Sequence, residues 1–171
     1  MAGAMTANTA TFEEIEADPS AMGQAVTVIL IAAFAALVGN IFRAGLGYGI
    51  GMMIMSLVGY GIWAVVVTLV GTKLMPEPTT TADFAETFRT IAFAASPGVF
   101  NVLAIIPFLG PLIGFAISIW SLIIMVIAVR SVLDYSNTGR AAIVVLIGFV
   151  IYWIVTILIL TPILITSFML R

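Results

Sequence analysis

The chain has 171 residues, of which 63% are hydrophobic, eight are acidic, six are basic and none is histidine or cysteine. Its mean hydropathy is +1.26, and its apolar content exceeds the roughly 45–50% of soluble domains. Five long apolar blocks without a central charge follow Met22, and several reach the ~20 residues needed to cross a bilayer. The pattern predicts an all-α integral membrane protein built as a five-span helix bundle.

The composition also limits the chemistry that the chain can carry. Without histidine or cysteine, imidazole and thiolate ligands for zinc, haem or iron–sulfur clusters are excluded. No Lys/Arg cluster is present to neutralise nucleic-acid phosphates. Every Asp and Glu lies in a predicted loop or surface helix, so we expect no buried acid, base or proton relay. We therefore predict a protein that is not an enzyme, with no cofactor, no metal and no nucleic-acid partner.

The first 21 residues predict a tail and a surface helix that precede the membrane domain, residues 22–171. Residues 1–10 are small and polar, and we expect them to fray. Thr11-Phe12-Glu13-Glu14 reads as a capping box, because a Thr side chain can accept from the amide three residues on while the Glu reaches back. The short N-terminal amphipathic helix that follows should end near Asp18-Pro19, since proline disfavours a helical residue before it.

Two spans come next. The first is predicted from Met22 to Ile41, and the second covers roughly Ile50 to Val70. Between them glycine occupies every second position from 45 to 51, which predicts a turn or a loosened helix start because glycine costs about 1 kcal/mol in a helix. Residues 75–81, rich in Pro and Thr, form the longest predicted loop.

An amphipathic segment precedes span three. Phe84, Phe88, Ile91 and Ala95 recur at helical spacing, while the charged and polar residues, Arg89 among them, lie elsewhere. This spacing predicts an interfacial helix. Ser96-Pro97-Gly98 then interrupts the pattern, so span three is either kinked at Pro97 or re-entrant, and the kink is favoured.

The last two spans follow a tight turn at residues 107–111, which predicts an antiparallel hairpin. Span four runs from about Leu112 to Val132, and Arg130 lies four residues before Asp134, the spacing of a helical ion pair. Span five, from Ala141 to about Leu170, would be about 45 Å long, so it must tilt, kink at Pro162 or protrude.

Basic residues near the span ends predict the orientation. With the N-terminus inside, four of them (Lys73, Arg89, Arg130 and Arg140) are cytoplasmic, while Arg43 and Arg171 face out. The positive-inside rule then favours a cytoplasmic N-terminus and an outer C-terminus.

Four groups of residues are candidate sites. Gly59-Tyr60-Gly61-Ile62-Trp63-Ala64 matches a loose dinucleotide-binding string, but it lies within span two, where small residues more often admit a neighbouring helix. The G-x-x-x-G pairs at 45/49, 47/51 and 110/114 mark packing within the bundle or a homodimer seam. Asn101 belongs to a substrate path or, as we favour, hydrogen-bonds to Ser118 or Ser121.

The charges of the last predicted loop form the fourth group. Arg130, Asp134 and Arg140 could engage lipid phosphate or a partner protein. The favoured alternative is a topology anchor, with Thr138 capping the last helix.

Together these features resemble the Yip family of five-span membrane proteins, in its short bacterial form. The resemblance covers Ala21 to Thr166 and is most specific at Ile106-Pro107-Phe108-Leu109-Gly110-Pro111 and Thr138-Gly139-Arg140-Ala141. The Asp-Leu-Tyr-Gly-Pro stretch of longer eukaryotic members is absent. The resemblance implies the five-span fold, a cytoplasmic N-terminus, a bacterial plasma membrane as the location and a membrane-organising role.

We therefore predict a non-enzymatic membrane scaffold that acts by helix packing with membrane-protein partners or by shaping the lipid bilayer. The alternatives are an accessory subunit of a larger energy-transducing or secretion complex, and a small-solute transporter or channel. The residues predicted to make interactions are Phe84, Phe88, Arg89, Asn101, Arg130, Asp134, Thr138, Gly139 and Arg140.

Overall fold

The computed structural model describes the backbone of residues 1–106 and 108–169, with the side chains of 42–49, 52, 156 and 159–169 excepted. Within this part of the chain all regular structure is helical, and the all-α membrane bundle is confirmed. Five helical stretches are long and apolar enough to cross a membrane. They are Pro19–Ile41, Met53–Leu74, Phe84–Ile105, Gly110–Val132 and Thr138–Val155.

The N-terminal residues fold onto the bundle instead of fraying. Helix α1 covers Ala2–Met5 and helix α2 covers Thr9–Ala17. The predicted capping box at Thr11 is wrong, because Asn8 is the N-cap and its side chain accepts from the amide of Ala10 at 3.0 Å. Phe12 is fully buried, so the apolar side of α2 packs inward. The predicted end is confirmed, since the 3-10 helix η1 (Pro19–Ala21) follows, capped by Asp18.

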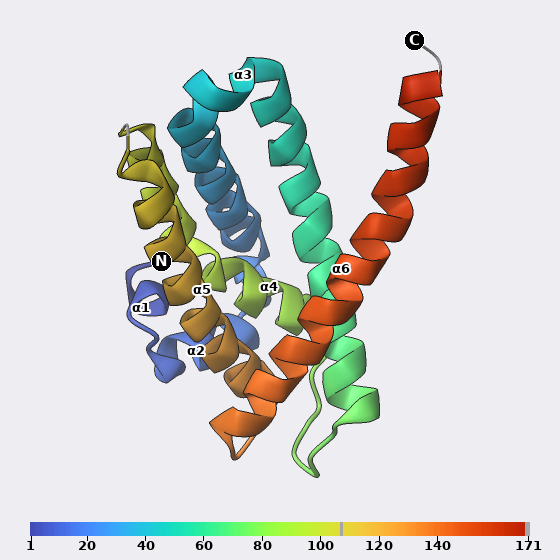
Figure 1. Cartoon of the computed structure of the whole chain (residues 1–171). Helices are drawn as coiled ribbons and strands as arrows, with labels where there is room; N and C mark the ends of the chain where they lie inside the picture. The colour runs from blue at the N-terminus through green and yellow to red at the C-terminus, as the bar shows by residue number, and fades with distance from the viewer. Residues whose placement is uncertain (107, 170–171) are drawn as a thin grey trace.

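Spans one and two belong to one long helical segment. Helix α3 covers Met22–Leu69 and continues into a π-helical turn, η2, at Val70–Leu74. The backbone stays helical through the glycine-rich stretch, yet the two halves of α3 run side by side in opposite directions (Figure 1). The predicted reversal of the chain is therefore present without a loop, which the many glycines make sterically possible.

Span three is bent at Pro97, as predicted. Helix α4 (Phe84–Ala94) lies across the bundle, and the 3-10 helix η3 (Ser96–Ile105) turns to run beside α5 (Figure 1). Asp83 opens α4 with a capping box that the sequence reading overlooked, since its side chain accepts from the amide of Glu86 at 2.8 Å and Glu86 reaches back. Most of α4 is buried, including Arg89, so the helix is packed inside the bundle rather than lying free at an interface.

Helices α5 (Gly110–Val132) and α6 (Thr138–Met169) complete the bundle. α5 runs antiparallel to η3, which confirms the predicted hairpin, although Pro107 itself lies outside the described residues (Figure 1). α6 is tilted and diverges from its neighbours toward the C-terminus (Figure 1), and its helical backbone continues through Pro162. Its 32 residues would measure about 48 Å, so the predicted tilt is the way this length is accommodated.

Two apolar clusters hold these elements together. One joins the second half of α3 to α5 and α6 through Trp63, Val67, Val129, Val132 and Val144. The other joins α1 and α2 to the first half of α3, to α4 and to α5 through Phe12, Ile15, Ile29, Phe93 and Ile124. Burying each such side chain stabilises the fold by about 1.5–3 kcal/mol.

The glycines test the packing interpretation. A Cβ on Gly59 would lie 2.9 Å from the hydroxyl oxygen of Tyr152 on α6, so this glycine admits a neighbouring helix as predicted. A Cβ on Gly39 would clash with the backbone oxygen of Asn101, which places α3 and η3 in close contact. Among the residues whose side chains are described, none lies within 4 Å of a Cβ placed on Gly114, so the predicted packing role of this glycine finds no support in that part of the chain.

Candidate functional site: a clasp between two loops

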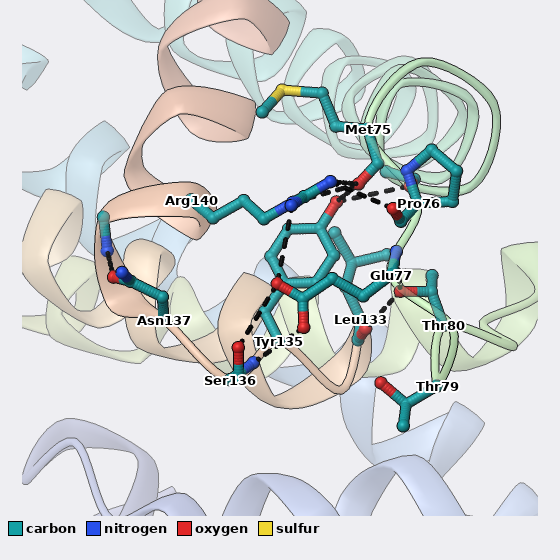
Figure 2. Close-up of polar contacts among 12 residues, drawn as sticks. Met75, Pro76, Glu77, Thr79, Thr80, Leu133, Tyr135, Ser136, Asn137 and Arg140 are labelled. Carbon is teal, nitrogen blue, oxygen red and sulfur yellow. Dashed lines mark hydrogen bonds and ion pairs between the residues drawn. The ribbon is translucent and has the colours of Figure 1, made fainter.

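The richest group of polar contacts joins two loops at one end of the bundle (Figure 2). One loop, residues 75–83, follows the π-helical turn η2; the other, residues 133–137, connects α5 to α6. We call the contacts between them the clasp, and the end of the bundle where they meet the clasp end. The side chains that form the clasp are Glu77, Thr79, Thr80, Tyr135, Ser136 and Arg140.

A left-handed residue at the end of α5 sets up the clasp. Asp134 has φ +52°, and the amide of Tyr135 donates to the carbonyl of Arg130 at 3.0 Å. This is the hydrogen-bond pattern that ends helices with a left-handed residue, a position that aspartate tolerates better than most. The reversal directs Tyr135 back into the bundle, where it is only 3% exposed.

Tyr135 ties the end of α5 to the end of span two. Its hydroxyl lies 2.6 Å from the carbonyl oxygen of Met75 and 3.2 Å from that of Gly71. The π-helical turn leaves the Gly71 carbonyl available, because the amide of Met75 donates to the carbonyl of Val70 instead, at 2.9 Å. Burial raises the pKa of Tyr135, so the hydroxyl remains a donor at neutral pH.

Arg140 binds the same loop from the first turn of α6. Its guanidinium donates to the carbonyl of Pro76 at 2.9 Å and to that of Met75 at 3.2 Å. It also lies 3.6 Å from the carboxylate of Glu77 and 5.5 Å from the ring centroid of Tyr135. One side chain thus satisfies two loop carbonyls, one carboxylate and one aromatic face (Figure 2).

Three further side chains close the clasp. The Glu77 carboxylate accepts from the amide of Ser136 at 3.1 Å. The hydroxyls of Thr79 and Thr80 donate to the carbonyls of Asp134 and Leu133 at 3.1 and 2.8 Å. Since the last carbonyls of a helix have no partner within it, the two threonines act as side-chain caps for α5.

The structure corrects two predictions about the last loop. The predicted ion pair of Arg130 with Asp134 is wrong, because Arg130 instead donates to the carbonyl of Tyr135 and the hydroxyl of Thr138 at 3.2 and 3.3 Å. The left-handed turn at Asp134 ends the helix before the i,i+4 geometry can form. Thr138 is not the cap of α6 either; Asn137 accepts from the amide of Gly139 at 2.7 Å.

A second polar contact anchors the N-terminal helices. Arg89, 5% exposed, donates to the carbonyls of Ile15 and Glu16 at 3.3 and 2.6 Å. These carbonyls end α2, where a cation also favours the negative end of the helix dipole. Arg89 can therefore be buried on α4 because the end of α2 lies against it and supplies its acceptors.

An acidic group surrounds this anchor. Burial, together with the nearby charges of Asp134, Glu86 and Glu13, raises the pKa of Glu16 to about 7, against an opposing effect of Arg89. Glu16 therefore titrates near neutral pH, which a surface glutamate does not do. Hydrogen bonds from Ser20 lower the pKa of Asp18.

The remaining predicted residues lie apart from the clasp. Phe84 is 47% exposed and packs against Phe88, with ring centroids 5.9 Å apart, while Phe88 contacts both apolar clusters. The predicted bond of Asn101 to Ser118 or Ser121 is wrong, since its amide donates to the carbonyl of Gly98 at 3.0 Å. Whether these residues bind a partner stays a prediction.

Sequence reasoning identified Arg140 but missed the groups that it binds. Glu77 and the threonines stood in a segment read as a plain loop, and Tyr135 was not singled out. Trp120 was not predicted as a site residue either, yet its indole N–H donates to the carbonyl of Met5 at 3.0 Å. The available signal for the clasp was the presence of Glu77, Thr79 and Thr80 in a proline-containing loop, together with an arginine, Arg140, just after the last loop of the chain.

The chemistry of the clasp is structural. Most of its hydrogen bonds end on backbone carbonyls, which are neither nucleophiles nor acids. In residues 1–106 and 108–169, no group of three or more acidic side chains lies close enough to hold a metal ion. The arrangement can fix helix ends and bind lipid or protein at its exposed rim.

The fold and the clasp define a polytopic α-helical membrane protein whose span ends are locked to one another. A family model for the Yip1 domain matches residues 2–158. The chain therefore belongs to the Yip1 domain family, as the sequence resemblance indicated. Neither the curated proteins nor the solved structures include a significant match to it.

Proposed function

We propose that this protein is a non-enzymatic membrane scaffold that holds membrane-protein partners by lateral helix packing. The observation that carries the proposal is the use of its basic side chains. Arg89, Arg130 and Arg140 all donate to groups of the chain itself. Arg89 holds the end of α2, Arg130 binds the loop after α5, and Arg140 ties the start of α6 to the loop after span two through the clasp. The large side chains exposed on the lateral faces of α5 and α6 are apolar, and these are the ones we propose for partner contacts.

The face of α6 is the proposed partner surface. Phe149, Val150, Trp153, Ile154 and Ile157 are each about half exposed there, at 49–55%, and α6 diverges from the bundle (Figure 1). Phe149 and Trp153 contact each other edge to face at 6.1 Å. Large aromatic side chains contribute most to packing at interfaces, so a partner helix would dock along this row.

Photo-crosslinking tests this function. A benzoylphenylalanine at Phe149 or Trp153 is expected to give a discrete protein adduct in native membranes, and the same residue at Phe115 on α5, 64% exposed, serves as the matched control. An adduct of stoichiometric yield would favour the accessory-subunit form of the scaffold. Exclusively lipid adducts at both α6 positions would overturn the proposal, as would solute flux in proteoliposomes that the R140Q substitution abolishes.

We also propose that the clasp end faces the cytoplasm. Arg89, Arg130 and Arg140 belong to this end, and Lys73 lies in the turn that precedes the clasp, which supports this orientation by the positive-inside rule. Because the chain has no cysteine, a Ser136→Cys variant reports the side directly. Labelling of this variant by an impermeant thiol reagent in intact cells, without permeabilisation, would contradict the orientation.

A further inference from the structure

The N-terminal segment, residues 2–17, runs along α5 from the clasp end to the middle of the helix. At one end of the segment, Glu16 lies within electrostatic range of Asp134. At the other, the carbonyl of Met5 accepts from the indole of Trp120 at 3.0 Å. Trp120 is the eleventh of the 23 residues of α5, about 18 Å from the clasp-end terminus Val132. Figure 1 shows the N-terminus at mid-height of the bundle.

The outer side of this segment is polar. Thr6, Asn8 and Thr9 are exposed near the depth of Trp120, and Glu13 and Glu14 are exposed on α2. The Thr6 hydroxyl donates to the carbonyls of residues 2 and 3, and the Asn8 side-chain oxygen accepts from the amide of residue 10. The cost of placing this flank in hydrocarbon therefore comes from the side-chain amide N–H groups of Asn8, the hydroxyl of Thr9 and above all the two carboxylates, at several kcal/mol for a polar group without a partner and more for a charge. Lipid tails therefore cannot cover this flank from the clasp end up to Trp120.

The flank formed by α6 is apolar over the same range. Ile143, Leu146 and Val150 are exposed at 49%, 64% and 52%. Val150 lies twelve residues from the clasp-end terminus of its helix, as Trp120 does on α5, so the two residues mark similar distances of about 18 Å from the clasp end. Hydrocarbon fits against α6 where it does not fit against the N-terminal segment.

We infer that lipid headgroups and water of the clasp-end leaflet reach the depth of Trp120 beside the N-terminal segment. From Gly110 to Trp120 the helix rises about 15 Å, so the hydrocarbon on this flank is about half its usual ~30 Å. A bilayer meeting a short apolar surface thins locally. The partner of this surface is the phospholipid headgroup layer, and the inference is independent of whether α6 binds another protein.

Single cysteines test the inference cleanly, because the chain has none of its own. Thr6→Cys and Thr9→Cys probe the N-terminal segment, Val150→Cys is the control at matched height, and Ser136→Cys is the aqueous reference. All four side chains are exposed, and Ser136→Cys keeps the backbone amide that donates to Glu77 at 3.1 Å. Folding should therefore be kept, and elution by size-exclusion chromatography verifies it. The proteins are placed in dioleoylphosphatidylcholine vesicles with a charged thiosulfonate on both sides.

The expected labelling rates at positions 6 and 9 are within about tenfold of that at position 136, and at least 100-fold above that at position 150. Rates at 6 and 9 as slow as at 150 would overturn the inference, because the segment would then lie in hydrocarbon. A rate at 150 as fast as at 6 would also overturn it, because the whole clasp-end half of the bundle would then protrude into water without thinning the bilayer.

Discussion

Replacing Arg140 with glutamine separates two ways in which the clasp could be stabilised. The guanidinium donates to two backbone carbonyls at 2.9 and 3.2 Å, whereas its contact with Glu77 is a looser 3.6 Å. Hydrogen bonds from a charged group contribute about 1.5–3 kcal/mol each when buried. The side chain is 36% exposed, so we take the lower end and expect Arg140→Gln to lower the free energy of unfolding by about 2–3 kcal/mol.

Glu77→Gln should cost less. The amide oxygen of glutamine can still accept from the amide of Ser136, and a partly exposed ion pair contributes only about 0.2–1 kcal/mol. We therefore expect a loss of about 1 kcal/mol for Glu77→Gln and a coupling energy below about 1 kcal/mol in the double variant. Lys73→Gln is the control, since Lys73 is exposed and surface changes of this kind stay within about 0.5 kcal/mol.

The assay is equilibrium unfolding by SDS titrated into mild-detergent micelles, followed by circular dichroism. Equal losses for the two single variants, with no further loss in the double variant, would refute the reasoning. That result would mean that the ion pair carries the clasp and that the carbonyl contacts add nothing.

Three other predictions follow from the packing of the helices. The pKa of Glu16 is about 7 with α2 docked and near 4.5 when α2 is released, so docking is strongest below pH 4.5 and weakens as the pH rises through 7. The docking equilibrium should change in total on the order of a hundredfold. Hydrogen exchange of α2 measured from pH 5 to 8 should show this pH dependence, and Glu16→Gln should abolish it. Arg89→Gln removes two donors to the end of α2 and should raise cleavage by a glutamate-specific protease at the N-terminus at least tenfold, with Arg89→Lys intermediate; unchanged cleavage would mean that apolar contacts alone hold α2. Gly39→Ala places a Cβ against the carbonyl of Asn101 and should destabilise the fold by more than about 2 kcal/mol, while Gly61→Ala, which meets open space, should be neutral or slightly stabilising.

The sequence predicted the spans well because hydrophobic length is a local property. The five apolar blocks, the bend at Pro97 and the hairpin before α5 all depend on residues within one segment. The reversal between the first two spans was also foreseen, although the backbone remains helical through it.

The clasp was harder to predict because it joins segments far apart in the chain. Thr80 bonds to a carbonyl 53 residues away, and Tyr135 to one 60 residues away. No local sequence pattern around Tyr135 predicts that its hydroxyl is buried. The left-handed conformation of Asp134 could not be predicted either, because it depends on the helix ending at that position. Arg89 shows the same limit. A charged residue on an amphipathic helix predicts a solvent-exposed side chain, and its burial becomes understandable only once the end of α2 is known to supply its acceptors.

The bond between Trp120 and Met5 joins residues 115 positions apart, and this separation bears on how the protein is made. During synthesis the N-terminal segment emerges before α4 and α5, the helices against which it packs. Until then Phe12 and Ile15 have no complete pocket and remain available to chaperones or to the membrane surface. Docking of the segment is thus a late event, which marks a chain whose first four spans have already been inserted.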